Sequence, residues 1–212
     1  MSTSPDTATT ATTTSAPPCP EQEKSKTTPT SDDDKSGEDK AASLPPLSAA
    51  EFRQYNAMAD HMDMFHNHFR STWNLLWSAC ESGKRPAGMS LRAFINQGLQ
   101  FVHHLEMHHG IEEAHIFPVL ARRMPEFKAG KGNGAAELLR QHRQIHKGMD
   151  GLEEYLKDVQ AGREEFNLAR LRERMESWSD VLWTHLDQEV KTLGAENMRK
   201  YWTLEEMKRM PM

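Results

Sequence analysis

Residues 101–120 read FVHHLEMHHGIEEAHIFPVL, in which five histidines and three glutamates interrupt an otherwise apolar stretch. If the stretch is helical, His108 and Glu112 lie on the same face as Phe101 and Leu105, and an amphipathic helix turns such a face toward a core. A histidine and a carboxylate are therefore predicted to point inward. Burying these groups is costly unless they are hydrogen-bonded, paired or coordinated to a metal ion, so the stretch predicts an internal partner for them.

Four segments of the chain show this helical spacing of apolar residues, and capping signals bound them. Ser48 and Glu51 have the spacing of a capping box at the start of the first segment, and Gly83 follows its end. Asn167 is a good cap for the fourth segment. The expected helices cover residues 48–82, 90–123, 135–161 and 167–193.

Three shorter features complete this assignment. Pro118 removes a backbone donor and should kink or shorten the last turns of the second helix. Residues 124–134, MPEFKAGKGNG, read as a connection between the second and third helices. A second capping signature runs from Thr203 to Glu206 and predicts a short helix near the C-terminus.

Four helices with short connections predict an all-α fold, an up-down-up-down antiparallel four-helix bundle. Residues 1–46 are rich in Thr, Ser and Pro and then acidic, which predicts a disordered low-complexity tail. The bundle is expected to span residues 47–194. Residues 195–212 form a C-terminal extension that carries the short helix.

Composition narrows the function classes. Residues 1–46 hold eight acidic and four basic residues of a chain with net charge −5, so the remainder is nearly neutral and predicts no nucleic-acid partner. Mean hydropathy is −0.77 and no run of eighteen apolar residues exists, which predicts no membrane span. Two cysteines, one of them in the tail, favour a reducing compartment. The cytoplasm is therefore expected, and the nucleus is not excluded.

Inward-facing histidines interrupt all four predicted helices at matched heights. His66 lies 16 residues before the end of the first helix, and His108 lies 18 residues after the start of the second. His142 lies 7 residues into the third helix, and His185 lies 7 or 8 residues before the end of the fourth. Random core histidines would align in this way only by accident, so the four side chains are predicted to converge.

Three of these positions belong to pairs at i, i+4, whose side chains leave one helix face and can reach a common ion. The pairs are His108/Glu112, His142/His146 and His185/Glu189, and His66 brings the set to five imidazoles and two carboxylates. One tetrahedral zinc ion takes four ligands, and the set contains no thiolate. Imidazole and carboxylate suit iron, and carboxylates can bridge a pair of ions, so the set predicts two iron ions.

The assembled motifs resemble a hemerythrin-like domain, also called an HHE cation-binding domain, over residues 48–193. The matching pieces are His66, HHGIEEAHIFP at 108–118, QHRQIH at 141–146 and HLDQE at 185–189. The resemblance implies a diiron centre in which one iron binds His142, His146 and His185, and the other binds His66 and His108. Glu112 and Glu189 would bridge the two ions, and the second iron would keep an open position.

The family also implies a range of functions: dioxygen binding, iron or oxygen sensing, nitric oxide or peroxide responses, and iron storage. In the oxygen carriers an Asp follows the last ligand histidine by five residues. Here Glu189 follows His185 by four, as in the broader HHE group, and this difference argues against reversible oxygen carriage.

The remaining histidines receive other assignments. His146 flanks the inward stripe of its helix, so a position at the solvent edge or beside a ligand histidine stays open for it as an alternative to metal binding. His104 lies one turn from His108 and would replace it if the register of the second helix were shifted. His115 lies on the inward stripe beyond Glu112 and is expected to support the site or the fold rather than bind metal. Glu113 is expected to be solvated or to hydrogen-bond a ligand histidine. The residues expected at the rim or surface are His61, His68, His103, His104 and His109.

The function expected from these residues is a module that binds or senses iron, dioxygen or a related small molecule. No catalytic residue is assigned, so a metal- and oxygen-binding protein is favoured over an enzyme. Two alternatives stay open: a diiron oxidoreductase, such as a ferroxidase or a peroxide-consuming enzyme, and a metal-free helical interaction protein. The sequence leaves the oligomeric state open.

Overall fold

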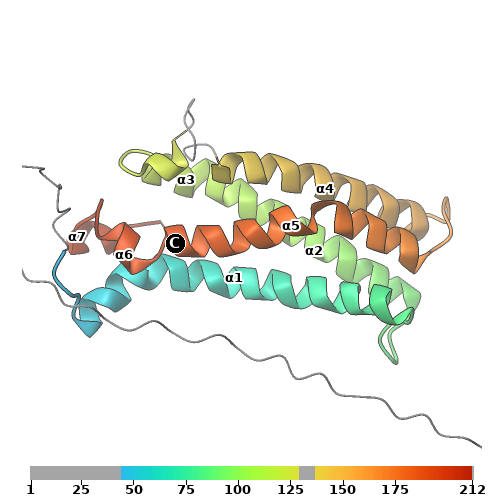
Figure 1. Ribbon diagram of the computed structural model, residues 1–212. Helices are drawn as coiled ribbons and strands as arrows, with labels where there is room; N and C mark the ends of the chain where they lie inside the picture. Colours follow the sequence, from blue (N-terminus) through green and yellow to red (C-terminus); the bar gives the residue numbers. More distant parts are fainter. Residues whose placement is uncertain (1–43, 129–136, 212) are drawn as a thin grey trace, which may run out of the picture. The chain divides into compact units, whose positions relative to one another are not determined.

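The computed structural model describes residues 44–128 and 137–211 (Figure 1). These residues contain helices and turns and no strand, which confirms the all-α class. Of the predicted tail, only residues 44–46 fall within this range. The α-helices are α1 (Ala49–Ser82), α2 (Leu91–Ile111), α3 (Phe117–Leu120), α4 (Glu137–Gln160), α5 (Leu168–Thr192), α6 (Ala195–Met198) and α7 (Leu204–Met207).

The predicted caps define the helix ends. The Ser48 hydroxyl accepts from the Glu51 backbone N–H at 3.3 Å, and the Glu51 carboxylate accepts from the Ser48 N–H at 2.8 Å. Helix α1 ends where Gly83 adopts φ 68°, a left-handed conformation that glycine tolerates best. The Asn167 side chain caps α5, and a capping box from Thr203 to Glu206 begins α7. The caps read from the sequence are confirmed.

The four long helices contact one another in pairs. Helix α1 packs against α2 and α5, and α4 packs against α2 and α5. Trp73 of α1 meets Trp178 of α5 edge to face, with ring centroids 4.9 Å apart and an interplanar angle of 88°. Such pairs add to the stabilisation from burial alone. Among the described residues, no helix combines the length and apolar character needed to cross a membrane.

The core consists of two apolar clusters separated by a layer of polar side chains. One cluster includes Phe69, Leu105 and Ile145, and the other includes Met62, Ile116 and Leu138. On α1, His66 lies between Met62 of the second cluster and Phe69 of the first. On α4, His142 lies between Leu138 of the second cluster and Ile145 of the first. The buried polar layer comprises His66, His109, Glu112, Gln141, His142, His185 and Glu189.

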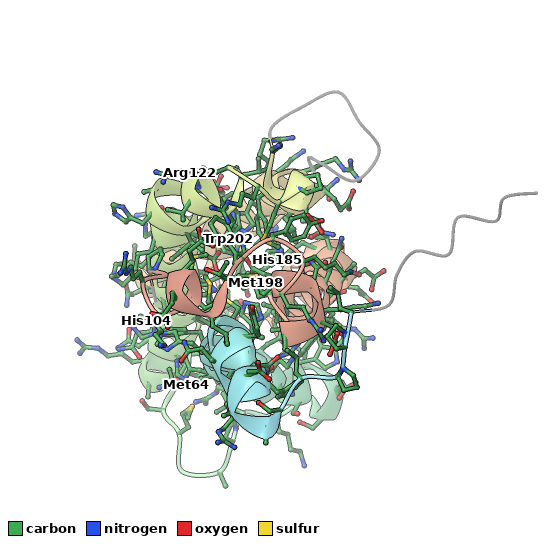
Figure 2. All side chains as sticks on the ribbon, turned by 90° about the vertical axis from the view of Figure 1, so that its left-hand side faces the viewer. Met64, His104, Arg122, His185, Met198 and Trp202 are labelled. Carbon is green, nitrogen blue, oxygen red and sulfur yellow. The ribbon has the colours of Figure 1, made fainter. Side chains whose placement is uncertain are left out.

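The two short C-terminal helices pack on the first helix. Both α6 and α7 contact α1, and Met198 and Trp202, labelled in Figure 2, join the second apolar cluster. The Arg123 guanidinium lies 4.6 Å from the centre of the Trp202 ring and hydrogen-bonds both Glu206 carboxylate oxygens. The C-terminal segment is therefore tied to the turn that follows α3.

The second predicted helix is not regular to its end. After α2 the chain forms a π-helical turn, η1 (Glu112–Ile116), in which the Phe117 N–H bonds the Glu112 carbonyl five residues back. Pro118 follows directly and has no N–H to continue an α-helical ladder. The wider turn accommodates one extra residue and shifts the inward face. Ile116 is buried and His115 is exposed, so the inward placement predicted for His115 is wrong.

The predicted connection at residues 124–134 is described only in part. Its first residues form a 3-10 turn, η2 (Pro125–Phe127), in which Phe127 is buried against Phe117 with ring centroids 5.1 Å apart. Residues 129–136 lie outside the described range. Helix α4 is described from Glu137 onward, so the predicted start at residue 135 falls outside the described range.

Candidate metal centre

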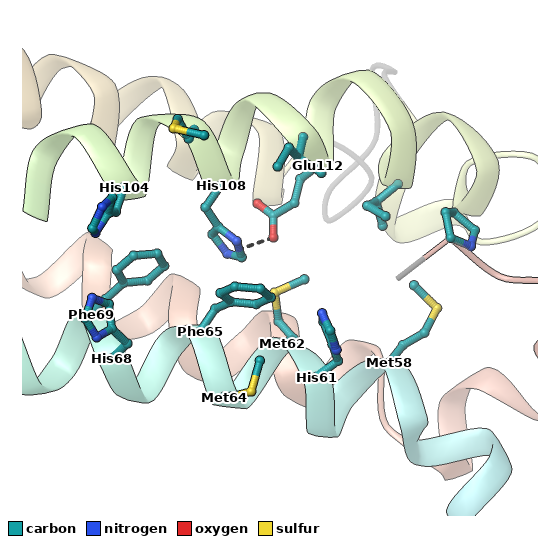
Figure 3. A pocket seen from close by; sticks show the side chains of 14 residues that line it. Met58, His61, Met62, Met64, Phe65, His68, Phe69, His104, His108 and Glu112 are labelled. Carbon is teal, nitrogen blue, oxygen red and sulfur yellow. Dashed lines mark ion pairs between the residues drawn. The ribbon is translucent and has the colours of Figure 1, made fainter. Parts of the chain in front are cut away.

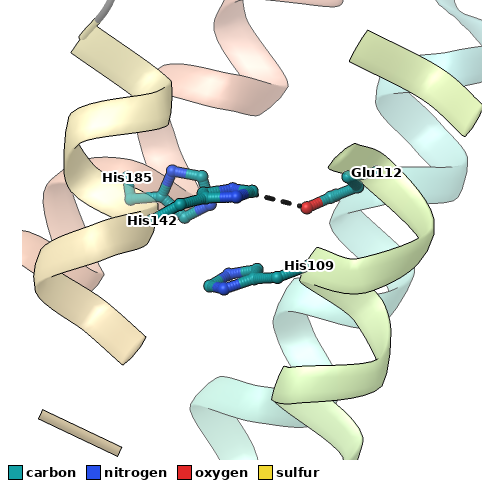
Figure 4. Close-up of side chains that lie close together, drawn as sticks. All are labelled: His109, Glu112, His142 and His185. Atoms are coloured by element: carbon teal, nitrogen blue, oxygen red, sulfur yellow. Dashed lines mark ion pairs between the residues drawn. The ribbon is translucent and has the colours of Figure 1, made fainter. Parts of the chain in front are cut away.

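The polar layer brings residues of all four long helices together in two adjacent groups. Within each group the potential ligand atoms lie within 4.8 Å of one another. Group one, drawn in Figure 4, comes from α2, η1, α4 and α5. Group two comes from α1, α2, η1 and α5. The members are His109, Glu112, His142 and His185 in group one, and His66, His108, Glu112 and Glu189 in group two.

Glu112 belongs to both groups. Its Oε1 lies 3.0 Å from Nε2 of His108, and its Oε2 lies 3.5 Å from Nε2 of His142. The carboxylate thus offers one oxygen to each group. Glu189 is placed similarly, because its Oε2 lies 3.4 Å from Nε2 of both His66 and His185. Each carboxylate therefore lies between a histidine four residues before it and a histidine of a neighbouring helix.

Hydrogen bonds on the outer ring nitrogens orient three of these histidines. Nδ1 of His66 donates to the Leu186 carbonyl at 3.0 Å, which fixes the proton on that nitrogen because a carbonyl only accepts. Nδ1 of His142 is 2.8 Å from Glu113 Oε1, and Nδ1 of His185 is 3.3 Å from the Gln141 side-chain oxygen. Each Nε2 is then left with its lone pair directed into the layer, as in metal-binding histidines.

The inward-facing atoms lack hydrogen-bond partners within the protein. Neither carboxylate oxygen of Glu112 or Glu189 has a hydrogen-bond partner. The same holds for both ring nitrogens of His109. Leaving one such buried group unsatisfied costs about 1–3 kcal/mol, and this layer concentrates many of them. The other atoms of the two groups in this condition are Nε2 of His66, His108, His142 and His185. The residues therefore fit a site for cations, which would satisfy imidazole lone pairs and carboxylates together.

The electrostatics of the layer lead to the same conclusion. Burial lowers the pKa of His185 to about 3 and that of His108 to about 4, and it holds the pKa of His109 well below its ordinary value. These rings are neutral at pH 7, which is the form that binds metal. Burial, and then the charge of Glu189, raises the pKa of Glu112 well above its ordinary value. A cation between the carboxylates would remove that penalty.

Six of the seven predicted ligand residues lie in the two groups: His66, His108, Glu112, His142, His185 and Glu189. His146 lies outside both groups and is only partly buried, with its ring centroid 5.3 Å from that of His109. Glu113, expected to be solvated or bonded to a ligand histidine, hydrogen-bonds His142. The predicted exposure is confirmed for four histidines: His61, His68, His103 and His104.

His109 is fully buried, so the rim position predicted for it is wrong. Helix α2 contacts α1 on one side and α4 on the other, so its buried sector is wider than one stripe. A second line of residues along the helix, beside the apolar stripe, indicates that His109 is buried. Ile95, Val102 and His109 repeat at seven-residue spacing, and all three are buried.

A cavity of about 570 Å³ leads from the surface to one side of the layer, between α1 and α2 (Figure 3). His108 and Glu112 lie along its lining, together with the side chains of Met62 and Phe65. Of the histidines in the two groups, only His108 retains exposure, at 10% of its side chain. The layer is therefore approachable at group two.

Residues 57–195 match the family model described as the hemerythrin HHE cation-binding domain. The match covers more than half of the chain and includes every member of both groups. Comparison with curated proteins and with solved structures found no match. A cation-binding family thus matches the same helices that bring the two ligand groups together. The chain belongs to the hemerythrin HHE cation-binding domain family.

Proposed function

We propose that this protein is a non-haem diiron-binding module that binds or senses iron, dioxygen or a related small molecule. The observation that carries the proposal is the sharing of Glu112 between two groups of inward-facing imidazoles. Imidazole and carboxylate ligands without a thiolate favour iron over a structural zinc ion. The two iron ions are the cofactor, and no nucleic acid or membrane partner is proposed.

The proposed ligand set differs from the family pattern at one residue. One ion would be held by His142, His185 and His109, which takes the place that the resemblance gives to His146. The other would be held by His66 and His108, with Glu112 and Glu189 bridging. The support for His109 is its complete burial and the lack of a partner on either ring nitrogen. His146 would then lie beside the centre without binding to it.

The second ion is the one proposed to keep an open position. Group two, which would hold this ion, has two imidazoles, whereas group one has three. Two members of group two, His108 and Glu112, line the cavity between α1 and α2. When bound, a pair of iron ions supplies reversible one-electron chemistry and a place for a small ligand. The protein side chains would exclude bulk water on the side of group one, where all members are buried.

A bundle topology and a cellular compartment are also proposed, the first from the helix contacts and the second from the composition. The pairwise contacts of the long helices and the short turn between α4 and α5 support an up-down-up-down antiparallel bundle. Residues 47–194 would form this bundle and residues 195–212 an extension packed on it. The composition supports the cytoplasm as the site of action.

A diiron oxidoreductase is the second candidate, because the cavity gives a substrate access to group two. Consumption of Fe(II) or peroxide beyond the stoichiometry of the centre would identify a ferroxidase or a peroxide-consuming enzyme. Oxidation that stops at the stoichiometry of the centre would identify a binding or sensing module.

Metal analysis tests the proposal directly. Protein loaded anaerobically with Fe(II), desalted and exposed to air should retain about two irons per chain and absorb as a ferric histidine–carboxylate centre. Failure to retain tightly bound metal after this treatment would overturn the proposal.

Thermal unfolding separates the proposal from a metal-free interaction protein. At free iron about 100 times the Kd, binding to the native state adds about 2.7 kcal/mol, which raises Tm by roughly 5–10 °C. The double variant His108→Ala, His185→Ala should lose this increase. If iron does not raise the Tm of the wild type, and the double variant unfolds at the same temperature as the wild type, the metal-free alternative is favoured.

A further inference from the structure

The cavity between α1 and α2 is large for the ligands considered so far. Its volume of about 570 Å³ falls within the range of about 300–1,000 Å³ that is typical of sites for organic molecules. A diatomic gas would leave most of this space unfilled. The size of the cavity therefore points to a larger occupant.

The cavity wall is mainly apolar and rich in methionine. Met58 and Met62 are buried in the wall, and Met64 and Met107 are exposed along it, as Figure 3 shows for the three methionines of α1. Methionine side chains are flexible and polarisable, and they adapt to apolar ligands of different shape. The wall is suited to the body of an apolar molecule.

Exposed apolar residues gather at the same place. Seven large hydrophobic side chains are exposed among the residues that the structure describes, and four of them line this one cavity. Exposed apolar residues scattered singly need no explanation, whereas a contiguous group marks a binding surface. The four residues are Met64, Phe65, Met107 and Ile111.

The inner part of the cavity is different in character. His108 and the almost fully buried Glu112 lie there, and neither the Nε2 of His108 nor the Glu112 oxygens have a hydrogen-bond partner. A ligand that fills the cavity would place one end beside these groups and the rest against methionine and phenylalanine. Its chemistry should match that division.

We propose that this cavity binds an amphiphilic organic molecule, with an apolar body along the methionine wall and a single oxygen-bearing end, such as a carboxylate, at His108 and Glu112. The apolar body depends on the cavity alone. The placement of the oxygen-bearing end rests on the proposed function, because it requires an iron ion with an open position at group two.

Binding can be measured with cis-parinaric acid, a fluorescent eighteen-carbon carboxylic acid, added to the full chain with and without iron. We expect saturable binding of one molecule per chain. The variant Met64→Glu, Met107→Glu places two charges on the wall and should weaken binding at least tenfold. Phe52→Glu is the matched control, since Phe52 is exposed on α1 outside the cavity lining, and it should bind as the wild type does.

The orientation is tested on the iron-loaded protein. Dodecanoic acid should change the absorption spectrum of the iron centre, and its methyl ester should bind without the same change. Iron content measured in each variant separates the cavity proposal from the proposed diiron centre. If the protein holds two irons per chain but shows no saturable probe binding, the cavity proposal is overturned and the diiron centre is not. Probe binding unaffected by the double Glu variant also overturns the cavity proposal. If the protein retains no iron after loading but still binds the probe in a way that depends on Met64 and Met107, the apolar site is supported and the placement of the oxygen-bearing end is overturned.

Discussion

The imidazole rings of His109 and His142 are stacked face to face, with centroids 4.0 Å apart and an interplanar angle of 13°. The two rings come from α2 and α4, and both are buried. His142 is oriented by Glu113, whereas His109 has no hydrogen-bond partner on either nitrogen. Two neutral imidazoles arranged in this way, beside Glu112, are suited to hold one ion between α2 and α4.

Replacing His109 should therefore weaken iron binding at group one. In His109→Ala we expect the tightly held iron to fall from about two per chain to about one, measured after loading and desalting. His146→Ala is the matched control and should keep about two, because His146 is outside both groups. The opposite pattern would place His146 in the ligand set and remove His109.

Glu113 should act on iron binding through His142. Its Oε1 is 2.8 Å from Nδ1 of His142, and partners of this kind change metal affinity about 10–100-fold. We expect Glu113→Ala to weaken binding at group one within that range, and Glu113→Gln to have a smaller effect because the amide oxygen still accepts. Competition with a chelator measures both. Glu106→Ala, an exposed glutamate of α2, serves as the control.

Two glycines of α4 should respond oppositely to the same substitution. A Cβ on Gly148 would lie 2.2 Å from Cγ of Trp178, so Gly148→Ala should destabilise the protein by about 1–3 kcal/mol through overpacking. A Cβ on Gly151 would meet only Arg174, at 3.7 Å, so Gly151→Ala should stabilise it by up to about 1 kcal/mol through helix propensity. Denaturant unfolding of the metal-free variants gives both values. Equal effects would contradict the close approach of Trp178.

The attachment of α7 should depend on pH. Hydrogen bonds from Arg123, and then from Thr203, lower the pKa of Glu206 to about 2. Because the folded pKa is depressed, the interaction is fully present above the ordinary value near 4.5 and is lost as the pH falls toward 2. Amide exchange in residues 204–210 should be faster in Glu206→Gln than in the wild type at pH 7, and this difference should disappear as the pH is lowered. A difference that stays undiminished as the pH falls from 7 to 2 would contradict the assignment.

The sequence predicted those features that depend on local chemistry. The capping residues Ser48, Asn167 and Thr203 define helix ends in the structure, because a cap is a short-range hydrogen bond between neighbouring residues. Helical spacing also predicts which histidines on the apolar face of a helix are buried. His66 and His185 are completely buried, as their spacing from Phe69 and Leu182 indicated.

Features that depend on neighbouring helices or on altered helix geometry were missed. A single apolar stripe per helix predicts His109 at the rim, whereas α2 is covered on two sides. A regular helix through Glu112 predicts that His115 faces inward, but the π turn changes the register. Pro118 predicts that the second helix is irregular near its end, but it does not predict which residues the irregular turn directs inward.

The π turn also has a consequence for how this segment tolerates changes in length. A wide turn holds one residue more than a regular helix needs to connect the same two inward positions. Deleting the exposed Ala114 would let a regular helix join Glu112 to the apolar residues beyond it with their burial unchanged. The same deletion at Glu106, inside regular helix, would rotate His108 and Glu112 by about 100° away from the other residues of the two groups. The segment beside Glu112 is thus the place in this helix where a one-residue insertion or deletion could be accepted during the divergence of related chains.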